Sequence, residues 1–328
     1  MSHVVIFIHI WVNNQLLLPI SIVRPYENCK IMRIFSFLLF TCTLLFSSFL
    51  VAADFVLPES RLEIEKRDLS KYFNSEALID IETEGGKSFA VFSQYMASQK
   101  RGVVILIPDI GHSPLSYNGF NYLYQALTDD GFDTYALQIP DIIYAEQNNT
   151  DESKEVPNKS ETDAIESMDN KVNQASKTVV IGLPEAQLDD YKTQVVAIFK
   201  ALYSQLTMRQ QEKLVVIAQG TSAGIFGEYL AELPNIKLDA FIAISAQLPH
   251  SERQRHLPAN FSLVSPPLLD VFYSNDSPLV TRNMAERIRW VKRNSKFDYR
   301  QRQLFGLTTE MRQHQRLRKE VDGFLRQL

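Results

Sequence analysis

The stretch KLVVIAQGTSAGIFGEYL, residues 213–230, decides the fold class expected for this chain. It opens with a continuous apolar run, passes through a cluster of small residues, and continues with apolar residues at helical spacing. A short continuous apolar run is typical of a strand buried on both faces, as in a mostly parallel sheet. The stretch therefore predicts a buried strand over 213–218, a tight turn, and a helix over 225–233.

The same alternation extends along the chain. Further strands are predicted at 77–82, 88–92, 102–108, 132–139, 238–245, 268–274 and 299–305. Helices are predicted between them at 117–130, 185–206, 285–293 and 310–327. Gly85-Gly86 predicts a hairpin between the first two strands. Repeated strand–helix–strand order predicts an α/β fold with a doubly wound, mostly parallel sheet.

A buried strand, a small-residue turn and a helix together form the nucleophile elbow of α/β-hydrolases. The elbow presents a serine on a strained turn above the sheet, in the pattern G-x-S-x-G. Residues 220–224, GTSAG, match this pattern literally, with Thr221 beside the candidate nucleophile Ser222. The sheet is therefore expected to be of the α/β-hydrolase type.

A second register of the same turn is favoured by the strand. The apolar run ends at Ala218, which places Gly220 where the nucleophile belongs. Ser222 would then start the helix, where its hydroxyl can cap backbone N–H groups. A third interpretation is that the small residues merely allow close packing of helix on strand.

The loop after strand 102–108 reads PDIGH, residues 108–112. In α/β-hydrolases this loop supplies one N–H group of the oxyanion hole. Asp109 and Gly111 occupy the corresponding positions, and a carboxylate opposes the role of a site that stabilises negative charge. His112 is either functional or, as we expect, an ordinary histidine of a surface loop.

Asp276 follows strand 268–274 and matches the position of the acid in a Ser-His-Asp triad. The surrounding NDSP is equally an ordinary turn sequence. The triad histidine is expected at 306–310, yet this segment reads GLTTE. His314 falls inside the last predicted helix, where we expect it to be packed. Without a base, a serine hydroxyl is a weak nucleophile.

The composition limits the classes of partner and cofactor that this chain is expected to bind. A net charge of −4 over 328 residues argues against nucleic acid, which requires a basic surface. The two cysteines, Cys29 and Cys42, precede the expected mature protein, so we expect no thiolate metal site, and no cofactor. Residues 279–328 carry 13 Lys or Arg against 5 Asp or Glu. The Arg-rich segment from Arg282 to Lys319 predicts a solvated helix face or a weak contact with an anionic envelope surface.

The N-terminal part predicts export. Met32-Arg33 precede an apolar run over 34–50 and small residues that end at Ala53. This pattern is typical of a secretory signal peptide over 32–53, cleaved after Ala53, and predicts a periplasmic protein. A membrane anchor is the alternative, because the apolar run is almost long enough to span a bilayer. Residues 1–31 are expected to be a spurious upstream extension.

Residues 54–328 are therefore expected to form one α/β-hydrolase-like domain. Within it, residues 144–178 are polar and carry 8 acidic and 4 basic side chains. Such a segment cannot bury enough apolar surface to offset its ordering entropy. It predicts a flexible, disordered acidic insertion, with a lid over the site as the alternative.

Four segments in this order carry a family resemblance. They are GVVILIPDIGHSP, GFDTYALQIPD, KLVVIAQGTSAG and LDVFYSNDSP. Together they resemble an uncharacterised proteobacterial family of exported α/β-hydrolase-like proteins, known as a domain of unknown function. The resemblance covers residues 58–328 without the insertion. It implies glycine at the elbow, Gly220, and Asp276 at the acid position. Thr308-Thr309 stand where some members keep a histidine.

Two functions remain open at this point. In the first, which we favour, the protein is non-catalytic and binds an unknown small molecule or an envelope component. In the second, it is a serine hydrolase that acts on ester or acyl groups through Ser222 and Asp276.

Overall fold

The computed structural model describes residues 59–117, 120–141, 182–206, 208, 212–233 and 236–328, together with two short strands nearer the N-terminus. These two strands, β1 (Trp11–Val12) and β2 (Gln15–Leu16), pair antiparallel within the unit Met1–Pro58. The second unit is Glu59–Leu328. The predicted signal peptide at 32–53 and the predicted insertion at 144–178 lie outside the described residues.

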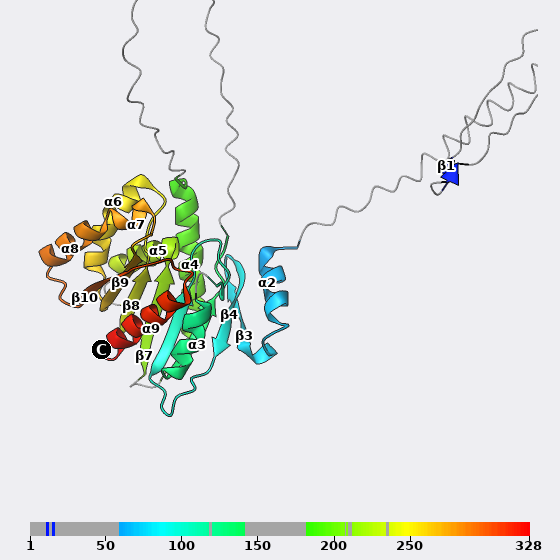
Figure 1. Cartoon of the computed structure of the whole chain (residues 1–328), viewed down its shortest axis with the longest axis horizontal. Helices are drawn as coiled ribbons and strands as arrows, with labels where there is room; N and C mark the ends of the chain where they lie inside the picture. The colour runs from blue at the N-terminus through cyan, green and yellow to red at the C-terminus, as the bar shows by residue number, and fades with distance from the viewer. Residues whose placement is uncertain are drawn as a thin grey trace, which may run out of the picture. The chain divides into compact units, whose positions relative to one another are not determined.

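The second unit is built on an eight-stranded sheet with the order β10-β9-β8-β7-β5-β6-β4-β3 (Figure 1). The strands are β3 (Leu78–Thr83), β4 (Gly86–Ser93), β5 (Gly102–Ile107), β6 (Phe132–Leu137), β7 (Lys213–Gln219), β8 (Ala240–Ile244), β9 (Leu268–Tyr273) and β10 (Tyr299–Leu304). β3 pairs antiparallel with β4, and β4 antiparallel with β6, whereas all other pairs are parallel. The predicted α/β-hydrolase type of doubly wound sheet is confirmed.

The strand order reverses at β5. This strand pairs with β6 on one side and with β7 on the other. The chain therefore first extends the sheet on the β6 side of β5 and later, from β7 onward, on the opposite side. Ligands of open α/β sheets bind at such a switch point, outside the carboxyl ends of the strands. The loop after β5 and the turn after β7 therefore meet where a site is expected.

Helices cover both faces of the sheet (Figure 1). The helices are α2 (Arg61–Leu69), α3 (Asn121–Asp129), α4 (Glu185–Gln205), α5 (Gly220–Glu232), α6 (Ser251–Leu263), α7 (Pro278–Thr281), α8 (Met284–Arg293) and α9 (Met311–Leu325), with a 3-10 turn, η2 (Ser75–Ala77). In β5, Val103, Ile105 and Ile107 pack in one core cluster with α4, α5 and α6. Val104 and Leu106 pack in the other cluster with α3 and α9. No helix in the described ranges is long and apolar enough to cross a membrane.

The structure contains elements that the sequence pattern did not predict. α2 has no fully buried residue, and it is defined by a capping box between Ser60 and Glu63. α6 carries Pro258 in its interior. Because an interior proline normally breaks a helix, the sequence pattern did not predict this one. α5 begins at Gly220, earlier than the predicted start at residue 225, because the small-residue cluster itself is helical.

One arginine of the Arg-rich segment contradicts the prediction of a solvated face. Arg287 on α8 is fully buried, and its guanidinium donates to both carboxylate oxygens of Asp270 on β9, at 2.9 and 3.0 Å. It also donates to the Ala246 carbonyl at 2.7 Å, and the Tyr299 hydroxyl donates to Asp270 at 2.8 Å. A buried strand aspartate requires a cationic partner, which explains why this arginine points inward.

We expect Arg287→Met to lower the free energy of unfolding by about 3–5 kcal/mol, because it leaves the Asp270 carboxylate buried and uncompensated. Adding Asp270→Leu should recover much of this loss, since the unpaired charge is then removed. Arg289→Met is the matched control: its side chain is 74% exposed, and a change within about 0.5 kcal/mol is expected. Chemical denaturation measures all three. Equal losses in the single and double variants would contradict the role of the ion pair.

Candidate functional site

The parallel pairing of β5 with β7 brings two of the predicted site segments together. Ile107 lies opposite Ala218 in the register, so both strands end at the same edge of the sheet. Asp109 follows β5, and Gly220 follows β7. The predicted oxyanion loop and the predicted elbow are therefore in direct contact.

The structure places Gly220 at the apex of the turn between β7 and α5. Its φ of +59° lies in the left-handed region, which glycine adopts without steric cost. A Cβ atom at this position would lie 2.0 Å from Oδ2 of Asp109. The turn thus has the backbone of a nucleophile elbow, while the space for a nucleophilic side chain is filled by a carboxylate.

The other oxygen of Asp109 binds two backbone N–H groups. Oδ1 accepts from the N–H of Thr221 at 2.7 Å and from the N–H of Ile110 at 2.8 Å. In α/β-hydrolases the oxyanion hole is made by the N–H after the nucleophile and an N–H of the loop after the third strand. Thr221 and Ile110 hold these positions. The Asp109 carboxyl group therefore accepts both N–H groups that would form such a hole.

Burial and hydrogen bonding act on this carboxyl group in opposite directions. Desolvation raises the pKa of Asp109, and the hydrogen bonds from Thr221 and Ile110 oppose that rise. The net shift is upward. Asp109 is thus less acidic than an ordinary aspartate although it is aimed at two N–H donors.

Ser222 lies inside the protein and is fully buried. Its hydroxyl donates to the Pro108 carbonyl at 2.5 Å and lies 2.6 Å from the hydroxyl of Tyr191 on α4. Because a serine has one hydroxyl proton, Tyr191 is the donor to Ser222. Burial raises the pKa of Tyr191 far above its ordinary value. The predicted helix cap by Ser222 is wrong, since its hydroxyl binds the end of β5.

Asp276 lies in the turn after β9, where the triad acid is expected. Its Oδ2 accepts from the Tyr273 N–H and from the Ser245 hydroxyl, each at 2.7 Å. Burial raises the pKa of this carboxyl group as well. Ser245 has a φ of +49°, an unusual backbone conformation for serine that aims it from the end of β8. Among the described residues, the partners of Asp276 thus include a serine hydroxyl and no imidazole.

His314 lies on α9 and is nearly buried, as its predicted position in the helix suggests. One ring nitrogen, Nε2, lies 2.7 Å from the Thr308 carbonyl. The rings of Tyr117 and Tyr122 pack against it at 5.7 and 5.8 Å. His112 is half-buried in the loop after β5, and its Nδ1 has no hydrogen-bond partner among the described residues.

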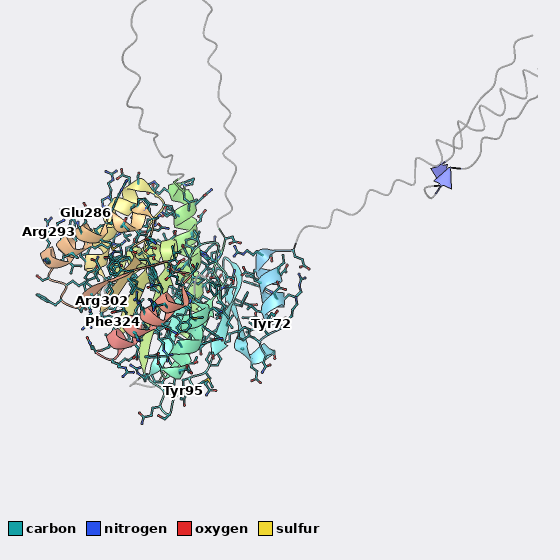
Figure 2. All side chains as sticks on the ribbon, viewed as in Figure 1. Tyr72, Tyr95, Glu286, Arg293, Arg302 and Phe324 are labelled. Carbon is teal, nitrogen blue, oxygen red and sulfur yellow. The ribbon has the colours of Figure 1, made fainter. Side chains whose placement is uncertain are left out.

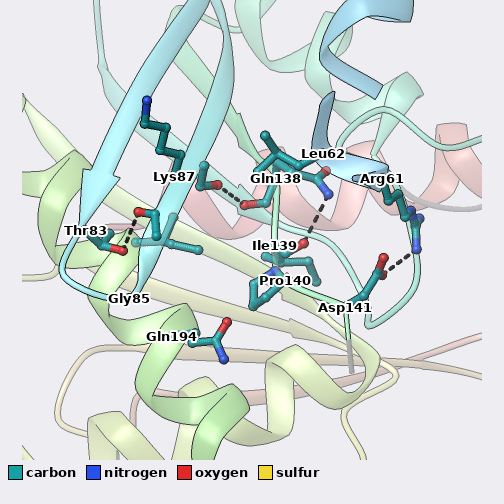
Figure 3. A pocket seen from close by; sticks show the side chains of 13 residues that line it. Arg61, Leu62, Thr83, Gly85, Lys87, Gln138, Ile139, Pro140, Asp141 and Gln194 are labelled. Carbon is teal, nitrogen blue, oxygen red and sulfur yellow. Dashed lines mark hydrogen bonds and ion pairs between the residues drawn. The ribbon is translucent and has the colours of Figure 1, made fainter. Parts of the chain in front are cut away.

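A cavity of about 200 Å³ opens beside this centre, between α2, the β3–β4 turn, the end of β6 and α4 (Figure 3). Arg61 closes one side: it pairs with Asp141 at 2.5 Å and donates to the Gly111 carbonyl at 2.8 Å. Gln138 is 3% exposed and donates from Nε2 to the Ile139 carbonyl, whereas its Oε1 has no partner among the described residues. The cavity therefore combines a fixed cation with an unused buried acceptor.

Metal binding finds no support within the described part of the chain, where no group of three His, Cys, Asp or Glu side chains is placed to hold an ion. Asp109, Ser222 and Asp276 instead have hydrogen-bond partners within the fold.

The comparison with protein families agrees with this fold. The model of the family described as "Protein of unknown function (DUF3530)" matches residues 56–327. The chain belongs to this family. No curated protein is significantly similar to this DUF3530 member in sequence.

Solved structures resemble this DUF3530 member in fold. Est1E from Butyrivibrio proteoclasticus is 10% identical, with a TM-score of 0.52, over 76% of this chain and 98% of that chain. Dienelactone hydrolase from Anabaena variabilis is 13% identical, with a TM-score of 0.49, over 76% and 96% of the two chains. Identity this low concerns the fold alone, and the Est1E likeness agrees with the strand order described above.

Three residues of the centre were not identified from the sequence. Tyr191 belonged to an apolar helical stripe, and nothing in the pattern indicates that its hydroxyl reaches Ser222. Ser245 ended a predicted strand without any motif. Arg61 lies on a helix that was not predicted, although the capping pattern of Ser60 and Glu63 could have revealed it.

We expect Gly220→Ala to be strongly destabilising in the wild-type background. The left-handed backbone costs an alanine about 1–2 kcal/mol, and overpacking against Asp109 adds about 1–3 kcal/mol. In an Asp109→Ala background, which removes the clashing carboxylate, only the backbone cost should remain. Thermal and chemical unfolding of the four proteins measures the coupling.

Gly323→Ala on α9 is the matched control for this cycle. Nothing lies within 4 Å of a Cβ at Gly323, and its φ is not in the left-handed region. Alanine in a helix interior should stabilise the protein by about 0.5–1 kcal/mol. Equal effects of Gly220→Ala with and without Asp109 would contradict the contact described here.

Proposed function

We propose that this DUF3530 member is an exported, non-catalytic binding protein built on the α/β-hydrolase fold. The observation that carries the proposal is the position of the Asp109 carboxylate. One oxygen lies in the hole that would stabilise an oxyanion, and the other fills the place of a nucleophilic side chain. A substrate carbonyl would have to displace a buried, doubly hydrogen-bonded group.

Serine hydrolysis needs three elements, and each is replaced by a structural contact. The elbow carries Gly220, which has no side chain to attack a substrate. The buried Ser222 donates its hydroxyl hydrogen bond to the Pro108 carbonyl. Asp276 accepts from Ser245 and Tyr273, and no imidazole among the described residues contacts it to form the pair that activates a serine.

Binding is supported by the cavity beside the centre. The lining is mostly polar and includes Arg61, Lys87 and Gln138, which suits a ligand that forms hydrogen bonds. Arg61 is already paired with Asp141, whereas the exposed Lys87 has no acidic partner among the described residues. The ligand class that fits is a small polar molecule with hydrogen-bonding groups, such as a component of the envelope.

A fluorophosphonate probe, which labels activated serines irrespective of substrate, tests the absence of catalysis. We expect no labelling of the wild-type protein or of Ser222→Ala, with an active serine esterase as the positive control. Ser222→Ala should lower the free energy of unfolding by about 1–3 kcal/mol, since two buried partners lose a hydrogen bond. Labelling that is present in the wild type and lost in Ser222→Ala would instead support a hydrolase acting through Ser222 and Asp276.

Export is proposed from the pattern of residues 32–53, with a periplasmic location for the mature protein. We expect N-terminal sequencing of protein from a periplasmic extract to begin at Asp54. Protein recovered from the membrane fraction with an uncleaved apolar segment would show an anchor and contradict this part of the proposal.

A further inference from the structure

An exposed apolar and basic surface, which we call the α8 tip, extends from the middle of α8 to its C-terminal end and includes the C-terminal end of α6. Its apolar members are Leu263, Ile288 and Phe297, which are 55%, 38% and 93% exposed. Its cations are Arg289, Lys292 and Arg293, all exposed. A phenylalanine ring that is almost wholly in water is costly, since burial of such a side chain is worth about 1.5–3 kcal/mol.

Two hydrogen bonds join the two parts of the α8 tip. Asn294 at the end of α8 donates to the Ser262 hydroxyl of α6 at 2.6 Å. Lys296 donates to the Pro266 carbonyl at 3.0 Å. Leu263 follows Ser262, and Phe297 follows Lys296. The two bonds therefore place Leu263 and Phe297 at the same end of this unit. α8 forms its outer edge (Figures 1 and 2).

The cations of the α8 tip are available to a partner. Within the described part of the chain, Lys292 and Arg293 have no acidic partner, and Arg293 lies 5.1 Å above the ring of Trp290. Arg289 reaches Glu286 only at 3.9 Å. By contrast, Arg287 on the opposite face of the same helix forms a buried ion pair with Asp270. The helix therefore separates the buried Arg287 from external cations, of which Lys292 and Arg293 have no acidic partner among the described residues.

We infer that the α8 tip docks on an anionic phospholipid surface. Exposed apolar side chains beside Lys and Arg are the combination that enters the headgroup region of a bilayer while the cations meet lipid phosphates. An anionic polysaccharide would use the cations and leave Phe297 and Leu263 in water. The inference rests on the proposed export, which brings the protein to an envelope membrane.

Docking through the α8 tip has a consequence for the candidate site. The tip adjoins the amino ends of β9 and β10, which begin at Leu268 and Tyr299. Gly220 and Asp109 follow the carboxyl ends of the parallel strands β7 and β5. The two surfaces lie at opposite edges of the sheet, so a docked protein presents its centre and cavity away from the bilayer.

Flotation of the purified protein with vesicles tests the inference. We expect binding to mixed phosphatidylglycerol–phosphatidylcholine vesicles at low salt, weakening as salt is added, and little binding to phosphatidylcholine alone. Phe297→Ser should reduce the partition coefficient about tenfold or more. The triple variant Arg289→Gln, Lys292→Gln and Arg293→Gln should reduce it on the order of 100-fold, about fivefold per charge.

The matched control removes three cations from α9, with Arg312→Gln, Arg316→Gln and Lys319→Gln. These side chains are also exposed and lack an acidic partner among the described residues, so the net charge changes equally. We expect this control to keep most of the binding, and all variants to keep the wild-type melting temperature.

Three results would overturn the inference. They are absence of binding to the anionic vesicles at low salt, wild-type binding by Phe297→Ser, and equal losses in the two triple variants. None of these depends on the probe labelling or on the N-terminal sequencing described above. The vesicle experiments can therefore contradict membrane docking without contradicting the proposed export or the proposed lack of catalysis.

Discussion

The centre of this protein depends on the contact between the Asp109 carboxylate and Gly220. The strands β5 and β7 end side by side, and the turns that follow them expose backbone N–H groups at the switch point of the sheet. Buried N–H groups require acceptors, and Asp109 supplies one oxygen to both Thr221 and Ile110. The second oxygen then occupies the volume of any side chain at residue 220, so only glycine fits. One carboxylate thus accounts for the geometry of the turn and for the glycine at its apex.

The polar groups around this contact follow the same principle of internal satisfaction. Ser222 is held between Pro108 and Tyr191, and Asp276 is held by Ser245. Each of these groups has a hydrogen-bond partner within the fold, and under the proposed function such contacts take the place of the mobile proton and the open position that catalysis requires. Gln138, which lines the neighbouring cavity, keeps a buried acceptor without a partner among the described residues.

The arginines of α8 have two different environments. Arg287 on its inner face is desolvated, and it is tolerated because Asp270 and the Ala246 carbonyl surround its guanidinium. Arg289 and Arg293 on the outer face are hydrated and lie near exposed apolar side chains. A count of basic residues in the segment therefore overstates the charge offered to a partner, and only the helix orientation separates structural from available cations.

The sequence by itself determined the α/β class, most strand positions and the candidate turns, because apolar runs and small-residue turns are local patterns. It also indicated that Asp109 is unsuited to an oxyanion site. It did not reveal α6, whose interior proline opposes its local pattern, or the inward orientation of Arg287. Tertiary structure alone decided that Asp109 and Gly220 touch, since these residues are distant in sequence and meet only through the pairing of β5 with β7. Contacts between strand ends depend on sheet order, which no local pattern encodes.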